Sequence, residues 1–389
     1  MPRKAKKNAP GAGTIRKRSD GRWEARYTVG FDPVTGKQKQ KSIYGKTQKE
    51  VRERLTEIIT QLDNNTYLEP TKDTVGDWLE AWLEVYVQFS VKPYTLDAYQ
   101  RNCRNYLEPA FGKLQLSALT APQIQKFYNS LLVDKKLSPK TVRNIHGVLH
   151  QALNRAVKLG MIRSNPTEVC DLPRARRKEI KPMEQSQITD FLKAIEGNKF
   201  ELLYQVTLFT GMRQGEVLGL TWDCVDFDYN TLYVNKQLGK TQKVGGNYTL
   251  VPTKNSRARV ITVASTVMDL LKEQKKRQIQ ARLLVGPEWN SPWDLVFTNE
   301  FGGYLTHYTV YKYFKSIVSS IGMEQKRFHD LRHSYAVAAI ESGDDIKTVQ
   351  SNLGHATASF TLDVYGHVSQ KMRQQSAERM EEFIHRVSG

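Results

Sequence analysis

Apolar and polar positions alternate with the two-residue period of β-strands near the start of the chain and follow a helical period over most of the remainder. Residues 13–30 alternate as two strands around a Ser-Asp-Gly turn, and residues 39–45 follow a second turn as a third strand. Thr47 then precedes a helix over residues 47–62, with Glu50 at the capping-box position. This pattern predicts a small three-stranded sheet with one helix.

A helical period returns after a polar linker at residues 63–74 that contains a proline. Helices are predicted over residues 74–89, 94–107, 120–134 and 138–160. The last two begin with a Thr or Ser cap followed by a proline in the first turn, which is typical of helix N-termini. We therefore expect a domain of four or five helices.

Prolines and a basic run at residues 164–183 break this pattern and indicate a second boundary. The segment 184–389 is mostly helical, with strands predicted within residues 232–240, 245–254 and 258–264. The predicted fold class is therefore multidomain and mainly α with small β elements. It combines an N-terminal three-stranded sheet plus helix, a helical domain, and a mixed α/β C-terminal domain.

The net charge of the chain indicates which class of partner it binds. Among 389 residues, 58 Lys and Arg face 40 Asp and Glu, which gives a net charge of +18, and the excess is concentrated in the first 60 residues. Such a surplus favours a polyanionic partner, and nucleic acid fits better than a membrane because no strongly amphipathic basic helix and no long apolar run is present. Three widely spaced cysteines and the absence of a signal sequence indicate a cytosolic protein.

Six residues of the C-terminal segment lie in short motifs and suit chemistry on a phosphodiester. They are Arg213 in GMRQGE, Lys254 in PTKNSRARV at the turn of a predicted hairpin, His329 and Arg332 in FHDLRHS, His355 in LGH, and Tyr365 ten residues later. Arginines match phosphate oxygens in a bidentate manner and stay protonated. A lysine can protonate a leaving oxygen, and a tyrosine activated by neighbouring cations and histidines can attack phosphorus. The set predicts covalent cutting and rejoining of DNA.

Other interpretations of these residues remain open from chemistry alone. His329 and His333 are four apart on one helix, which is also a metal-ligand spacing, but the sequence is not H-E-x-x-H and an arginine would oppose a dication. We therefore predict no metal, and we interpret His333 as a packing residue. Glu216, one turn after Arg213, is interpreted as an orienting group. Neither a phosphate-binding glycine loop nor an acidic metal cluster is present in the sequence, so we expect no cofactor.

Candidate DNA-contact residues occur in both N-terminal segments. The predicted sheet provides Trp23, Arg26, Tyr27, Lys39 and Lys41, and the last long helix of the second segment begins with Lys140, Thr141, Arg143 and Asn144. Packing of Trp23 and Tyr27 on the helix is the alternative for the two aromatic residues.

In these motifs, their order and their spacing, nearly the whole chain resembles the tyrosine recombinase family of phage-type integrases. The resemblance implies catalytic roles for Arg213, Lys254, His329, Arg332, His355 and the nucleophile Tyr365, with Glu216 as the structural acid. It also implies an arm-type DNA-binding domain at 1–63 with a basic tail at 1–12, a helical SAM-like core-binding domain at 74–166, and a catalytic domain at 183–389. The tail 366–389 would dock in trans on a neighbouring subunit, or pack in cis.

The family resemblance further implies the partners and the reaction. A homotetramer would hold double-stranded DNA at core-type and arm-type sites, form a 3′-phosphotyrosine, and exchange strands through a four-way junction in the bacterial cytoplasm, in association with the nucleoid. An excisionase and DNA-bending proteins would assist, and the source would be a phage or a conjugative transposon. A type IB topoisomerase-like enzyme and a DNA-binding regulator with a decayed catalytic centre are the alternatives.

Overall fold

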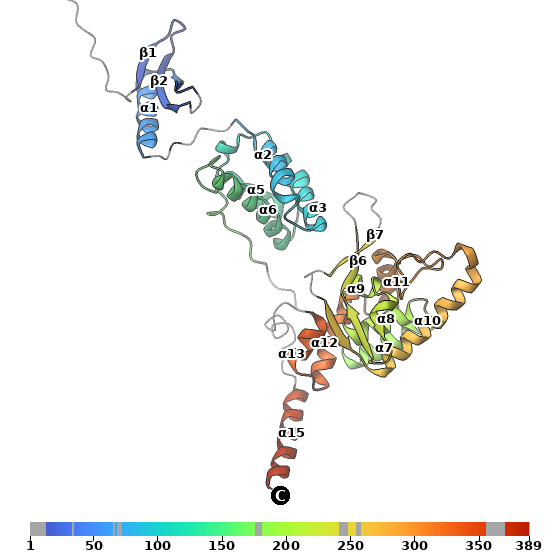
Figure 1. Cartoon of the computed structure of the whole chain (residues 1–389). Coiled ribbons are helices and arrows are strands. Elements are labelled where there is room, and N and C mark those ends of the chain that lie inside the picture. Colours follow the sequence, from blue (N-terminus) through green and yellow to red (C-terminus); the bar gives the residue numbers. More distant parts are fainter. Residues whose placement is uncertain are drawn as a thin grey trace, which may run out of the picture. The chain divides into compact units, whose positions relative to one another are not determined.

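The computed structural model describes residues 13–32, 35–64, 67, 72–175, 181–240, 248–253, 258–354 and 370–388. The chain divides into two compact units, Met1–Ala175 and Arg176–Gly389 (Figure 1). The predicted basic tail 1–12 and residues 366–369 of the predicted C-terminal tail lie outside the described residues.

The first unit begins with an antiparallel sheet of order β1-β2-β3, formed by β1 (Thr14–Lys17), β2 (Trp23–Phe31) and β3 (Gln38–Gly45). Helix α1 (Gln48–Asp63) follows, and the Thr47 hydroxyl accepts a hydrogen bond from the Glu50 amide, so the predicted cap is present. The prediction of three strands and one helix is confirmed. One face of the sheet packs on α1 through a small apolar core around Ala25, Tyr27, Val51 and Leu55.

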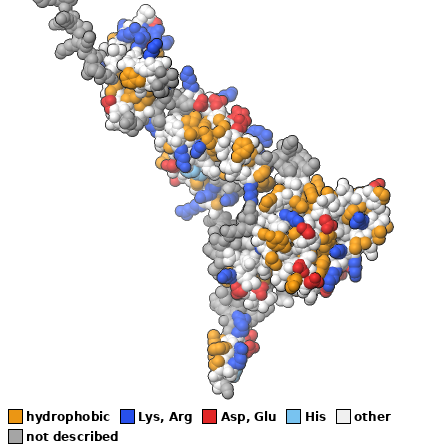
Figure 2. All heavy atoms as spheres, viewed as in Figure 1, with side chains coloured by type: hydrophobic (Ala, Val, Ile, Leu, Met, Phe, Trp, Pro, Cys, Tyr) orange, Lys and Arg blue, Asp and Glu red, His pale blue; other side chains and the backbone are white. Residues whose placement is uncertain are grey.

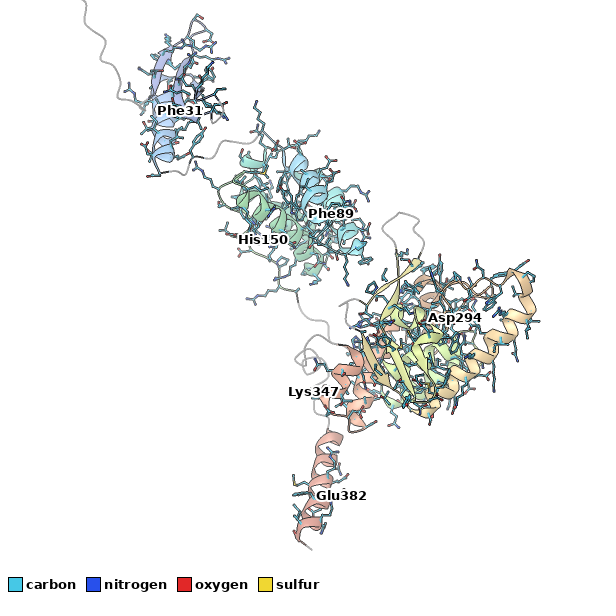
Figure 3. The ribbon with its side chains drawn as sticks, viewed as in Figure 1. Phe31, Phe89, His150, Asp294, Lys347 and Glu382 are labelled. Carbon is cyan, nitrogen blue, oxygen red and sulfur yellow. The ribbon has the colours of Figure 1, made fainter. Side chains whose placement is uncertain are left out.

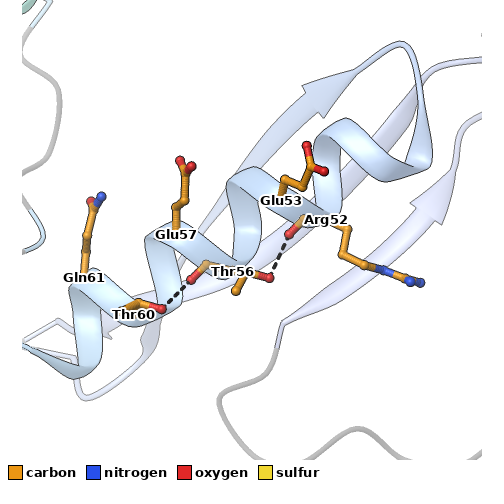
Figure 4. Close-up of a pocket in the computed structure, with 6 residues that line it drawn as sticks. All are labelled: Arg52, Glu53, Thr56, Glu57, Thr60 and Gln61. Carbon is orange, nitrogen blue, oxygen red and sulfur yellow. Dashed lines mark hydrogen bonds between the residues drawn. The ribbon is translucent and has the colours of Figure 1, made fainter.

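The opposite side of α1 is polar and lines a surface pocket, and Figure 4 shows the side chains that form it. The hydroxyls of Thr56 and Thr60 donate to the carbonyls of Arg52 and Thr56, at 3.0 and 2.9 Å. Because these threonines satisfy their hydroxyls on their own helix, they do not need a partner from another element. The helix therefore buries one stripe against the sheet and presents a hydrated surface on the other side.

The helical part of the first unit contains the predicted helices, but two of them change their winding. Residues predicted as single helices at 74–89 and 94–107 each continue an α-helix into a π-helical turn. The elements are α2 (Val75–Ala81), the π turn η1 (Trp82–Val87), α3 (Pro93–Asn102), the π turn η2 (Cys103–Leu107), α4 (Glu108–Phe111), the 3₁₀ turn η3 (Leu116–Ala118), α5 (Ala121–Val133) and α6 (Pro139–Lys158).

Helix α6 is the main support of this bundle. It buries a stripe that includes Val142, Ile145 and Leu149, and the indole nitrogen of Trp78 donates to the Ala152 carbonyl at 2.9 Å. His150, labelled in Figure 3, lies on the same helix. Its Nδ1 lies 2.8 Å from the Thr167 hydroxyl. The contact between His150 and Thr167 fixes the segment that follows α6 against the bundle.

The second unit is a mixed α/β domain. Its elements are α7 (Gln185–Ile195), α8 (Glu201–Thr210), α9 (Gln214–Leu218), the 3₁₀ turn η4 (Trp222–Cys224), β4 (Val225–Asp226), β5 (Thr231–Val234), β6 (Lys236–Lys240), β7 (Tyr248–Pro252), β8 (Arg259–Thr262), α10 (Ser265–Val285), the 3₁₀ turn η5 (Gly286–Glu288), α11 (His307–Ser320), α12 (Phe328–Glu341), α13 (Ile346–Leu353) and α15 (Gln370–Ser388).

Helix α8 lies at the centre of this domain and packs against α7, α10 and α12 (Figure 1). It is apolar around most of its circumference, as expected for a helix buried on several sides. Its two buried threonines, Thr207 and Thr210, donate to the carbonyls of Leu203 and Val206, so both hydroxyls have an acceptor within the helix. Because α8 is held on several sides, the loop that follows its C-terminal end starts from a fixed position.

The strand pairing corrects the sequence-based expectation of a hairpin around Lys254. The two strands that flank it do not pair with each other, because β7 pairs with β6 and β8 pairs with β5. The predicted single strand 232–240 is divided at Asn235 into β5 and β6, which join two different sheets. Gly219, which directly follows α9, allows β6 to lie close, since a Cβ at this position would stand 2.5 Å from the Leu238 nitrogen.

Candidate active site

Arg213 lies between two helices, at a position fixed by the backbone. Helix α8 is capped by Gly211, whose φ of 64° is left-handed, and α9 begins immediately after Arg213. A Cβ at Gly211 would stand 2.4 Å from Cδ1 of Tyr335, so only glycine fits this turn. The turn presents the Arg213 side chain, which is 21% exposed, at the domain surface.

Glu216 is fully buried between two arginines. Its Oε1 accepts from Arg213 Nη1 at 2.7 Å and from Arg259 Nη1 at 3.1 Å. Its Oε2 accepts from the Arg213 amide at 2.9 Å and from Arg259 Nη2 at 2.7 Å. Burial acts to raise the pKa of this carboxyl, but the two arginines outweigh it and hold the pKa at about 2. Glu216 is therefore an ionised, four-fold hydrogen-bonded anchor, in line with the orienting interpretation.

Arg332 extends from α12 into the interior, and its side chain is only 1% exposed. Its Nη1 donates to the Gly211 carbonyl at 2.8 Å, and its Nη2 donates to the Leu353 carbonyl at 2.6 Å. One guanidinium thus ties the C-terminal end of α8 to the C-terminal end of α13. Charged hydrogen bonds of this kind compensate part of the cost of burying an arginine.

Three arginines donate hydrogen bonds to successive carbonyls at the C-terminal end of α13, one arginine to each carbonyl. Arg259 Nε donates to Asn352 at 2.7 Å, Arg332 donates to Leu353, and Arg213 Nη2 donates to Gly354 at 3.3 Å. The end of a helix bears partial negative charge and lacks internal donors, so guanidinium groups stabilise it. Gly354 caps the helix with a left-handed φ of 64°. Two arginines predicted from sequence, Arg213 and Arg332, therefore converge directly before His355.

The two histidines of α12 lie in contact, with ring centroids 4.7 Å apart and perpendicular planes. Burial lowers the pKa of His333 to about 4, and Arg327 and Arg332 act in the same direction. Desolvation, His333 and the nearby arginines also lower the pKa of His329, although this residue stays exposed to solvent, which moderates the effect. Within the described ranges, no group of three or more His, Cys, Asp or Glu is placed to hold a metal ion.

Three of the predicted catalytic residues, Lys254, His355 and Tyr365, lie outside the described residues. The described chain stops one residue before each of the first two, at the buried Thr253 and at Gly354. Among the described residues of this set, Arg213 bonds Glu216, Arg213 and Arg332 donate to adjacent carbonyls at the end of α13, and the charges of both arginines act on His329. Sequence reasoning missed Arg259, although it stands inside the PTKNSRARV motif. Its side chain shares the anchor of Arg213, a link that the residue spacing does not show.

In the N-terminal sheet, the five predicted contact residues do not lie on one face, so together they cannot form a single DNA-binding surface. Tyr27 is 6% exposed and packs toward α1, and its hydroxyl lies 2.9 Å from that of Tyr67. Trp23 packs against the same core. Lys41 pairs with Tyr27 in register, so it also belongs to the α1 side, and only Arg26 projects from the other side. The alternative of aromatic packing therefore applies to both aromatic residues.

The outer face of this sheet is organised by Glu24. The carboxylate accepts from Arg16 Nε at 2.7 Å, from Arg26 Nε at 3.0 Å and from the Ser42 hydroxyl at 2.8 Å. These side chains hold the pKa of Glu24 at about 2. The guanidinium of Arg18 lies over the ring of Tyr44, 5.3 Å from its centroid. Figure 2 shows Lys and Arg gathered over the N-terminal sheet.

At the start of α6, Lys140, Arg143 and Asn144 are exposed and Thr141 is half-buried. Nη1 of Arg143 donates to the Pro173 carbonyl at 3.2 Å. These side chains occupy the solvent side of the helix, opposite the buried stripe. Their position is compatible with contact to a ligand as large as a nucleic acid.

The C-terminal helix α15 bears an apolar stripe of Met380, Phe383, Ile384 and Val387, each largely exposed. Figure 2 shows these apolar side chains on one side of the helix and charged side chains on the other. Spacing by three and four residues places them on a single face. In the part of the chain that the structure describes, no helix is both long and apolar enough to cross a membrane.

Comparison with known proteins covers nearly the whole chain. Residues 180–372 match the phage integrase family, and residues 74–132 match the SAM-like N-terminal domain of phage integrases. A XerC-like tyrosine recombinase of Caldanaerobacter subterraneus subsp. tengcongensis is 30% identical over 375 residues, covering 92% of this chain and 95% of the relative.

Two solved structures have a similar fold. The integrase of the transposon Tn1549, in complex with a circular intermediate DNA, aligns with a TM-score of 0.66 and 21% identity, over 79% of this chain and 100% of that chain. A lambda integrase tetramer bound to a Holliday junction aligns with a TM-score of 0.58 and 18% identity, over 92% of this chain and 96% of that chain.

Proposed function

This chain belongs to the phage integrase family of tyrosine recombinases, and on that premise we propose how its residues recombine DNA. It is a site-specific recombinase of a mobile genetic element, which breaks and rejoins DNA strands. The observation that supports the residue assignments best is the convergence of Arg213 and Arg332 on adjacent carbonyls at the end of α13. We propose that these two guanidinium groups hold a phosphodiester, Arg213 from the domain surface and Arg332 from its buried position at the end of α13.

In the proposed reaction, the phosphodiester binds against Arg213 and Arg332, which stabilise the charge that develops on its non-bridging oxygens. The phenolic oxygen of Tyr365 forms a bond to phosphorus, and the bond from phosphorus to the 5′ oxygen breaks. The product is a 3′-phosphotyrosine. One of the two histidines, His329 or His355, accepts the phenolic proton, and both are proposed to hydrogen-bond the phosphate. Lys254 protonates the leaving 5′ oxygen.

Rejoining is the reverse of this step. A 5′ hydroxyl attacks the phosphotyrosine, the bond to Tyr365 breaks, and the proton returns to the phenol. The energy of the cleaved bond is kept in the covalent intermediate, so the proposed reaction needs neither ATP nor a cofactor. When the attacking hydroxyl comes from a second duplex, the strands are exchanged and a four-way junction forms.

We assign DNA contacts to both units. Residues 1–63 bind arm-type sites, the helical domain 74–166 binds core-type sites, and 183–389 forms the catalytic domain. In the arm-type domain, the outer face with Arg16, Arg26 and Tyr44 is the better candidate, because its arginines are held in place by Glu24. In the core-binding domain, the exposed start of α6 with Lys140 and Arg143 is the candidate.

The proposed active assembly is a homotetramer on two DNA duplexes in the bacterial cytoplasm, aided by an excisionase and DNA-bending proteins. The lambda integrase tetramer on a Holliday junction supports the tetramer by similarity of fold. The apolar stripe of α15 supports a tail that docks on a neighbouring subunit, because an exposed face of this kind gains stability when it is covered.

A recombination assay tests this function. A plasmid that contains both ends of the element is incubated with the protein in EDTA and without ATP. We expect excised and resealed circles whose junctions lie at the ends. Relaxation of supercoiled DNA without recombinant circles, and independent of the ends, would instead support the topoisomerase-like alternative.

A further inference from the structure

Arg259 connects two parts of the active site that come from distant segments of the chain. It is the first residue of β8, and its side chain is only 8% exposed. Its two Nη groups donate to the carboxylate of Glu216, while its Nε donates to the Asn352 carbonyl at 2.7 Å. All three hydrogen bonds start from the planar guanidinium of Arg259, and the geometry of this group fixes their directions.

This geometry requires a guanidinium. The ammonium group of a lysine is a single point of charge on a flexible stem and cannot bond both carboxylate oxygens of Glu216 and a carbonyl in a different direction with fixed geometry. The bidentate contact with Glu216 also limits the rotation of the carboxylate, which in turn accepts from Arg213. The position of Arg213 therefore depends on Arg259 through the two oxygens that they share, Oε1 for the Arg213 side chain and Oε2 for its amide.

The second contact of Arg259 acts on the helix that leads to His355. The Asn352 carbonyl belongs to the last turn of α13, and the chain reaches His355 directly after Gly354. The approach is tight, since a Cβ at Gly354 would stand 3.1 Å from both Cδ and Nη1 of Arg259. The guanidinium thus sets the distance between the β8 strand and the end of α13.

We propose that Arg259 is a positioning residue for strand cleavage, which holds Arg213 and the end of α13 in one geometry without contacting the DNA. This role rests on the proposed function. It differs from a contribution to folding alone, because a positioning residue affects the rate of cleavage on bound DNA more than it affects DNA affinity. Residues that orient a reactive group typically change activity by about 10- to 100-fold when replaced.

The test uses the full-length protein and a nicked suicide duplex that contains the junction of the element's ends. Arg259→Lys is compared with the wild type and with Arg277→Lys, a matched control on α10 whose exposed arginine pairs only with Glu273 among the ion pairs described. Dissociation constants, thermal unfolding and single-turnover cleavage at saturating protein are measured. We expect about 10- to 100-fold slower cleavage for Arg259→Lys, with affinity within about twofold of the wild type. Arg277→Lys should match the wild type.

Two further variants keep the proposal open to contradiction. If Arg259→Lys fails to fold, a double variant with Glu216→Gln and Arg259→Gln is used in its place. This variant removes both charges, so it leaves no buried carboxylate without a partner. Adding Arg259→Lys to Arg213→Lys should slow cleavage by less than Arg259→Lys does alone, because both changes act on the same anchor. Wild-type cleavage by Arg259→Lys, equal loss of affinity and rate, or full additivity would each overturn the role of Arg259. A wild-type protein that forms no adduct would instead contradict the proposed function.

Discussion

The carboxylate of Glu216 meets the guanidinium of Arg259 with both oxygens, at 3.1 Å from Oε1 to Nη1 and 2.7 Å from Oε2 to Nη2. The same two oxygens receive the side chain and the amide of Arg213. One buried anion therefore positions two cations, one of which is proposed to meet the phosphate. The stability of this site and its geometry depend on the same residue.

Removal of Glu216 should destabilise the second unit strongly. Glu216→Ala leaves Arg259 buried without its carboxylate partner, and the loss of one member of a buried ion pair costs about 3 to 5 kcal/mol. Glu273→Ala is the control, because it breaks an exposed helix pair that contributes less than about 1 kcal/mol. Urea unfolding of both variants measures the difference. Equal midpoints for the two variants would contradict this account of Glu216.

Gly211→Ala should destabilise the turn that presents Arg213. Its left-handed φ and the contact of the new Cβ with Tyr335 together cost about 2 to 4 kcal/mol. Gly147→Ala is the matched control, because Gly147 lies within α6 and its Cβ would meet nothing within 4 Å. That change should stabilise the bundle by about 0.5 to 1 kcal/mol. A Gly211→Ala protein as stable as the wild type would show that the turn tolerates a side chain.

The stability of the second unit should fall as the pH is lowered from 7 to 5. His333 is buried and neutral in the folded state, with a pKa of about 4, whereas in the unfolded chain it protonates near 6.5. Protons therefore bind the unfolded state preferentially between these values. The loss at pH 5 is about 2 kcal/mol. Urea unfolding of wild type and His333→Asn at both pH values tests this, and an equal pH dependence of the two proteins would contradict it.

The outer face of the N-terminal sheet should contribute more to DNA binding than the α1 side. Replacing Arg16 and Arg26 by Gln should weaken binding to arm-type sites and reduce the salt slope by roughly 0.9 for each phosphate that the protein no longer neutralises. Replacing Lys39 and Lys41 by Gln removes the same charge from the other side and is the matched control. Titrations at several salt concentrations distinguish the pairs, and equal effects would refute a binding face defined by Glu24.

Local signals in the sequence predicted the elements of this protein well. Thr47 with Glu50, and Ser138 with Pro139, indicated helix starts because capping depends only on neighbouring residues. Pairing between distant strands has no such local signal, so the assignment of β7 and β8 to different sheets was missed.

The same limit explains which parts of the site were predicted. Arg213, Arg332 and their motifs could be recognised because each has a distinctive local context. Arg259 has its partners, Glu216 and Asn352, in two remote segments, so its role became visible only in three dimensions. In the N-terminal sheet, the alternation of residues 23–27 was correct, but the side that faces α1 could not be derived from the strands alone.

The measurement that tests the central claim most directly is covalent capture of DNA by Tyr365. Wild type and Tyr365→Phe are incubated in EDTA with a suicide duplex that is nicked near the crossover site, and the products are separated on denaturing gels. The account predicts a protein–DNA adduct with the wild type and none with Tyr365→Phe, although both bind the duplex. An adduct with both proteins would identify another nucleophile, and no adduct with either protein on a bound site would contradict covalent catalysis.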